Sequence, residues 1–364
     1  MKDYRKLISK HRNAIMGLMA IIIIIYHAKW STNNWLFENT INKYGSIGVD
    51  VFVFVSGFGL AYALTKYDSF EKYIIKRFRR ILPAYYMFEI LNLLVALVLL
   101  IFGIKNNLMQ PIESILPVGV WVNFDSNRNL AYKWYISAIL GFYLISALIY
   151  PAMRRSKYLY LTTFLMLLIT VGFIPYISDM SNMPFAVQRI PALVTGLAVG
   201  VASLRKEKKY QKSSIGLICL VVLCAIGVTM IAFEGKMPGE YLTKMTSAQT
   251  LSLKQSLIAP LFTVLLACIF ELLNYIHLNK VVKYFVWLGK LSLELYLIHS
   301  ILYGLLELTS LSKSTQILMT VLLSIPAAVL LKWLSEKLLV LWEKISIHFF
   351  TKDNNTMNIA QIEQ

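Results

Sequence analysis

The chain has 364 residues, of which 57% are hydrophobic and only 15% are charged, and its mean hydropathy is +0.62. These values exclude an ordinary water-soluble domain of this length. The net charge of +17 follows the segments between apolar runs and forms no single patch, so it indicates the anionic inner face of a bilayer and no nucleic acid.

Runs of about twenty apolar residues recur along the chain, each long enough to cross a bilayer as a helix. We therefore predict an all-α polytopic transmembrane bundle of about ten helices. The second predicted span contains Asp50, and the ninth contains Lys290, Glu294 and His299. The spans are 14–30, 47–65, 83–104, 134–152, 158–176, 186–203, 214–233, 252–274, 285–306 and 315–334.

Lys and Arg gather in alternate connecting segments, and cytoplasmic loops are enriched in these residues. This bias predicts that both termini are cytoplasmic in a multi-pass protein of the cell membrane, surrounded by its lipids. We predict one membrane domain over residues 1–350, followed by a short polar cytoplasmic tail over residues 351–364.

Three ionisable residues fall at a similar depth within predicted spans. His27 lies thirteen residues beyond the start of the first span, roughly 20 Å across at 1.5 Å per residue. His299 lies at about the same depth in the ninth span, and Asp50 enters the second span from outside. Each alone could sit in the headgroup zone, but together they favour a functional site, since hydrocarbon rejects such residues.

Three arginines follow the second span, in the segment from Phe70 to Pro83. Arg77 and Arg80 are three positions apart, so on a helix they share a face and could clamp phosphate oxygens. The alternative is that they only mark the cytoplasmic side. Pro83 suits the first turn of the third span.

Further intramembrane polar and small residues have structural interpretations. Glu294 could form an ion pair with Lys290, one helical turn before it. The glycines at 57, 59, 196 and 200 allow neighbouring helices to approach closely, so we interpret both glycine pairs as packing positions.

Six segments, taken in order, resemble the acyltransferase-3 family of integral membrane O-acyltransferases. Their order, their spacing and their spread over nearly the whole chain carry this resemblance. The segments lie at residues 26–27, 48–58, 77–83, 134–143, 189–196 and 288–299.

The resemblance implies a bundle of about ten helices that takes an acyl group, usually acetyl, from cytoplasmic acyl-coenzyme A. Acetyl-CoA would be the co-substrate, and the acceptor would be a hydroxyl of a cell-surface or cell-envelope glycan. The implied binding positions are Arg77 and Arg80 for the donor, and Trp134, Arg189 and Glu294 for substrate. We assign no metal ligands.

The sequence departs from the family pattern at two places. The family usually has an Arg eleven positions before the first-span His, where this chain has Met16. Arg12 lies one turn earlier, but helical side chains lean toward the N-terminus, so we expect Arg12 to point away from this gap. Many members also have acidic residues where this chain has Ile139 and Leu140, and we assign no acid there.

These residues suggest a mechanism of acyl transfer. A sugar hydroxyl needs a base to take its proton as it attacks a thioester, and imidazole titrates near neutral pH. We therefore predict His27 as the base, Asp50 as its orienting partner and His299 as a second polar group of the site. The rival hypothesis is a transporter or glycan flippase that uses the same polar layer. A purely structural protein would leave these residues unexplained.

Overall fold

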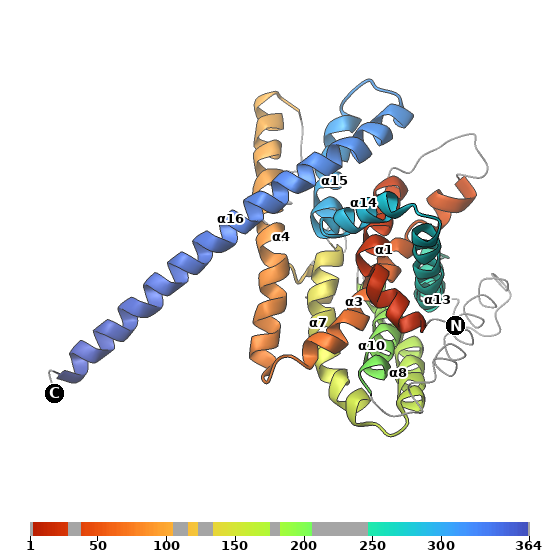
Figure 1. Cartoon of the computed structure of the whole chain (residues 1–364). Helices are drawn as coiled ribbons and strands as arrows, with labels where there is room; N and C mark the ends of the chain where they lie inside the picture. Colours follow the sequence, from red (N-terminus) through yellow and green to blue (C-terminus); the bar gives the residue numbers. More distant parts are fainter. Residues whose placement is uncertain are drawn as a thin grey trace.

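The computed structural model describes residues 3–27, 38–104, 116–122, 134–174, 183–205 and 247–362. Every regular element in these ranges is helical, which confirms the all-α prediction (Figure 1). The predicted span at 214–233 lies outside the described residues.

The described helices match most of the predicted spans in position. Seven of them are long and apolar enough to cross a membrane, or eight if a bent pair counts as one span, so the protein is a multi-pass membrane protein. The count of ten and the placement of the termini stay predictions. The long helices are α1 (Tyr4–His27), α3 (Ile47–Leu64), α4 (Phe70–Ile101), α7 (Trp134–Arg155), α8 (Leu159–Phe173), α10 (Ile190–Leu204), α13 (Ser247–Tyr275), α14 (Asn279–Gly289), α15 (Ser292–Glu307) and α16 (Lys313–Ile362), and the short ones are η1 (Glu38–Asn42), α6 (Gly119–Val122) and α9 (Met183–Val187).

The outer surface of the bundle is apolar over several of these helices. A soluble protein rarely exposes so many large apolar side chains side by side, whereas a bilayer solvates them. Examples are Leu94, Leu97 and Leu100 on α4 and Leu322 and Leu330 on α16.

Helices α3 and α10 cross in the centre of the bundle, and their glycines make this crossing possible. A Cβ atom at Gly196 would collide with the backbone carbonyl of Phe54, and one at Gly57 would lie 2.5 Å from the carbonyl oxygen of Leu193. The packing interpretation is therefore confirmed for these two positions.

A second close crossing joins α1 to α14 and fixes the position of α15. A Cβ atom at Gly289 would collide with the backbone carbonyl of Asn13, and one at Gly17 would collide with that of Phe285. Directly after Gly289 the chain bends by 73° into α15. The span predicted at 285–306 is therefore bent, because the chain turns where Gly289 ends α14 against α1.

Helix α4 begins thirteen residues before the predicted start of its span. Ser69 caps it by accepting a hydrogen bond from the backbone N–H of Lys72 at 3.3 Å. Pro83 lies inside the helix and does not begin it, so that prediction is wrong. Arg77 and Arg80 therefore belong to α4 itself and not to a loop.

Helix α16 is the longest element and continues through the predicted polar tail to Ile362. It packs against α4 and α15 and then extends away from the bundle (Figure 1). Arg79 of α4 and Glu343 of α16 form an exposed ion pair with an N–O distance of 3.5 Å.

Candidate active site

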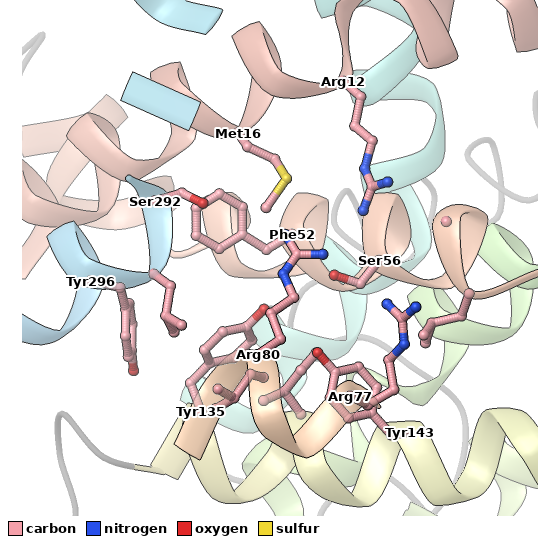
Figure 2. Close-up of a pocket in the computed structure, with 15 residues that line it drawn as sticks. Arg12, Met16, Phe52, Ser56, Arg77, Arg80, Tyr135, Tyr143, Ser292 and Tyr296 are labelled. Atoms are coloured by element: carbon pink, nitrogen blue, oxygen red, sulfur yellow. The ribbon is translucent and has the colours of Figure 1, made fainter. Parts of the chain in front are cut away.

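An inner cavity, partly open to solvent, lies among α1, α3, α4, α7 and α15. Both predicted donor-binding arginines, Arg77 and Arg80, line it, as the prediction of a shared face requires. Figure 2 shows Arg12 and Met16 reaching into it from α1 and Arg77 and Arg80 from α4. The remaining polar lining consists of Ser56, Tyr135, Tyr143, Ser292 and Tyr296.

An outer cavity adjoins the inner one, and it also opens to solvent. The two cavities share Arg12, Gly59, Arg77 and Arg80. We call these three arginines the arginine neck. The outer cavity adds Lys10 and Lys66, and neither lining contains an Asp or Glu within the described parts of the chain.

The position of Arg12 differs from the one predicted from the sequence. Arg12 was expected to point away from Met16, but both residues line the inner cavity. Its guanidinium lies against Gly59 of α3, where a Cβ atom would be 2.7 Å from Nη1. The lean of helical side chains is an average tendency, and the absence of a side chain at Gly59 leaves space for the guanidinium beside the cavity.

The two predicted histidines meet at the far end of α1. Nε2 of His299 lies 3.1 Å from Nδ1 of His27, and the two rings stack with centroids 5.0 Å apart. His299 is completely buried, whereas His27 is half-buried. Tyr303 ties the two helices together by donating a hydrogen bond to the carbonyl of Ile24 at 2.9 Å.

The hydrogen bonds of His299 determine the tautomers of both rings when both are neutral. Nδ1 of His299 lies 3.1 Å from the carbonyl oxygen of Leu295, so it must carry the proton that it donates. Its Nε2 is then the acceptor for Nδ1–H of His27. The lone pair of the His27 ring is therefore on Nε2, the position that a general base needs.

Aromatic rings connect the inner cavity to the histidines. Tyr296 lines the cavity, and its ring centroid lies 5.8 Å from that of His299 and 5.1 Å from that of Tyr135. A group that enters past the arginine neck would therefore approach the histidine pair beside Tyr296.

Asp50 has a partner other than His27. Its Oδ1 lies 3.7 Å from Nε of Arg189, whose guanidinium lies over the ring of Trp134 at 4.5 Å from the centroid. Neither carboxylate oxygen makes a hydrogen bond within the described part of the protein. The predicted site residues Asp50, Arg189 and Trp134 are thus brought together. The geometry favours His299 over Asp50 as the orienting partner of His27.

Glu294 lies near the start of α15, between the cavity-lining residue Leu293 and the buried Leu295. Within the described residues no ion pair joins it to Lys290, whose side chain is exposed, so the predicted pair is not formed. Glu294 does not line either cavity.

Sequence reasoning missed several residues of the cavity. Tyr135 and Tyr143 are eight positions apart and therefore share a face of α7, which was a usable signal. Arg12 and Tyr296 carried no such signal. The position of Arg12 depends on the space at Gly59, and that of Tyr296 depends on the bend before α15.

The fold and this site define a multi-pass membrane protein with a cationic cavity, whose lining residue Tyr296 contacts His299 of a histidine pair. A family model described as an acyltransferase domain, that of the acyltransferase-3 family, matches residues 13–336. The chain belongs to this family and is a membrane-bound acyltransferase, which disfavours the transporter alternative. The comparisons with curated proteins and with solved structures each found no match.

Proposed function

We propose that this acyltransferase takes an acyl group, acetyl in the first instance, from cytoplasmic acyl-coenzyme A. The acceptor is a hydroxyl of a cell-surface or cell-envelope glycan, and the enzyme works in the cell membrane. One observation carries the proposal: the outer and inner cavities share the arginine neck, and Tyr296 of the inner cavity lies beside His299.

The charge of the cavities supports a donor with several phosphates. Three arginines and two lysines line them, and no Asp or Glu belongs to the described linings. Lys10 is paired with Glu271 outside the lining, at an N–O distance of 2.6 Å, so the three arginines and Lys66 are the cations that favour a polyanion. Arg12 and His27 are fifteen residues apart on α1, which is roughly 22 Å along a helix. The long pantetheine arm of coenzyme A suits this separation.

The proposed transfer uses the histidine pair directly. The acceptor oxygen attacks the thioester carbonyl while Nε2 of His27 takes the hydroxyl proton. The C–S bond then breaks, and the departing thiolate receives that proton, which gives the ester and free coenzyme A. His299 acts as a positioning residue, because it accepts the hydrogen bond from Nδ1–H of His27 before and after the proton moves.

The test is turnover by the purified protein in lipid nanodiscs. Labelled acetyl-coenzyme A is supplied with envelope glycans, and both free thiol and labelled glycan are measured, with longer acyl thioesters as competitors. We expect thiol release that depends on the glycan and equals the label transferred. Thiol release that ignores every hydroxyl acceptor would contradict the proposed reaction.

A further inference from the structure

We propose that Arg12 binds the diphosphate of the acyl donor, and that Gly59, which has no side chain, leaves the space that the guanidinium of Arg12 occupies. The inference deepens the proposed function and rests on it. Arg12 lies one helical turn before Met16, the position at which the family usually has an arginine.

Arg12 lies where the two cavities meet. Together with Arg77 and Arg80 it lines both cavities, whereas Met16 lines the inner one alone. Figure 2 shows the three guanidinium groups directed toward one region beside Ser56, with Met16 next to them. Coenzyme A has its diphosphate between the adenosine and the pantetheine arm. A donor whose arm enters the inner cavity therefore places its diphosphate in the arginine neck.

The hydrogen-bonding state of the neck supports an anion there. Nε of Arg12 and Nε of Arg77 are both buried without a hydrogen-bond partner in the described structure. Three like charges around one space also repel one another, and the linings offer no described carboxylate to offset them. A diphosphate would supply both the acceptors and the opposite charge.

Gly59 explains how Arg12 reaches the neck. A Cβ atom there would lie 2.7, 2.8 and 2.9 Å from Nη1, Nη2 and Cζ of Arg12. Gly57 and Gly196 face backbone atoms of a neighbouring helix, but Gly59 faces the flexible end of a side chain. The packing interpretation therefore does not hold for Gly59. An added methyl group would displace the guanidinium without disturbing the helices.

The outer cavity accommodates the rest of the donor. Lys66 and Lys10 line it beside the rings of Phe58, Tyr62 and Tyr67. Cationic and aromatic side chains suit the 3′-phosphate and the adenine, respectively. Substitution of Arg12 should therefore weaken binding through the diphosphate, and substitution of Lys66 should weaken it through the 3′-phosphate.

The experiment measures Kd for coenzyme A and for dephospho-coenzyme A, which lacks only the 3′-phosphate. The protein is studied in zwitterionic nanodiscs, with and without added phosphatidylglycerol. Arg12→Gln and Gly59→Ala are compared with wild type. Gly304→Ala is the matched control, because a Cβ atom there meets nothing within 4 Å. Thermal unfolding verifies that each variant is folded, and Gly59→Ala keeps the test open if Arg12→Gln does not fold.

We expect Arg12→Gln to weaken both ligands by the same factor, about tenfold to a hundredfold, because a charge-assisted contact to the shared diphosphate is lost. Gly59→Ala should do the same to a lesser extent, and Lys66→Gln should weaken coenzyme A alone. Loss confined to coenzyme A in Arg12→Gln would overturn the diphosphate assignment, as would unchanged Kd values in both Arg12→Gln and Gly59→Ala.

Two further outcomes separate this inference from the function on which it rests. If the wild type binds neither ligand, the proposed function fails, and the inference fails with it. If phosphatidylglycerol abolishes coenzyme A binding in wild type, the neck serves a lipid phosphate instead, and the donor assignment is overturned.

Discussion

His27 and His299 lie 272 positions apart in the chain, yet Nδ1 of the first and Nε2 of the second are separated by only 3.1 Å. This contact is the structural basis for the proposed base. It fixes the orientation of the His27 ring and, through the hydrogen bond from Nδ1 of His299 to Leu295, its tautomer.

Replacement of His27 by Ala should abolish acyl transfer and leave membrane insertion intact. The change removes the base without altering the apolar character of α1, so we expect kcat to fall by a factor of about 10² to 10⁴. His277→Asn is the control, because His277 is exposed in a turn at a φ of 62° that Asn tolerates. Labelled transfer by well-folded His27→Ala at the wild-type rate would exclude this residue as the base.

Replacement of His299 should reveal a positioning role. In His299→Gln the side-chain oxygen can still accept the hydrogen bond from Nδ1–H of His27, whereas His299→Ala leaves that donor without its acceptor. We therefore expect Gln to retain several times more activity than Ala, with KM for the donor unchanged in both. Equal loss in the two variants, or a rise in KM alone, would argue against positioning.

The ion pair between Asp50 and Arg189 should contribute to stability. Both side chains are buried, at 0% and 5% exposure, so Asp50→Asn leaves the charge of Arg189 without its counterion. Breaking such a pair from one side costs about 3 to 5 kcal/mol, and we expect a lower thermal midpoint in detergent. The double variant Asp50→Asn with Arg189→Gln should recover much of this loss. Activity lost at unchanged stability, with no recovery in the double variant, would instead support the predicted link from Asp50 to His27.

Gly289 should be intolerant of any side chain. Its position against the backbone of Asn13 sets the crossing of α1 and α14, and with it the place of α15 and His299. Gly289→Ala should lower the free energy of unfolding by about 1 to 3 kcal/mol through overpacking. Gly304→Ala, where the same methyl group meets open space, should change stability much less. Similar thermal midpoints for the two variants would show that the crossing is loose.

The sequence predicted the positions of the helices well wherever a helix is apolar along its whole length. It failed at the start of α4, because hydropathy detects the apolar part of a helix and not the charged turns that Ser69 caps before it. The bend after Gly289 was missed for a related reason: the apolar run continues through it, and only the contact with Asn13 reveals the break.

The sequence predicted those features of the site that follow from the depth of a residue in a span or from its face of a helix. His27 and His299 were expected in one layer, and they meet, although the depth of His299 was counted along a helix that is in fact broken. Lateral contacts are set by tertiary packing, so the pairing of Asp50 with Arg189 could not be derived from one sequence. The direction of Arg12 depends on the space at Gly59 of another helix.

The consequence of Met16 can be tested by moving the guanidinium between two turns of α1. Met16 and Arg12 both line the inner cavity, where Arg77 and Arg80 already supply positive charge. Met16→Arg in the wild-type background adds a further like charge to the same space, so we expect little gain in donor affinity. In the Arg12→Met background, Met16→Arg should restore most of the affinity that the first change removes.

The measurement is Kd for coenzyme A in wild type, both single variants and the double variant, which together form a double-mutant cycle. A non-additive cycle, in which Met16→Arg helps only when Arg12 is absent, would show that the two positions serve the same phosphate. Met16→Gln in the Arg12→Met background controls for polarity, since Gln is polar but carries no charge, and it should restore nothing. If Met16→Arg instead raises affinity by the same factor in both backgrounds, the two positions contact different groups of the donor, and Arg12 cannot be the substitute for the missing family arginine.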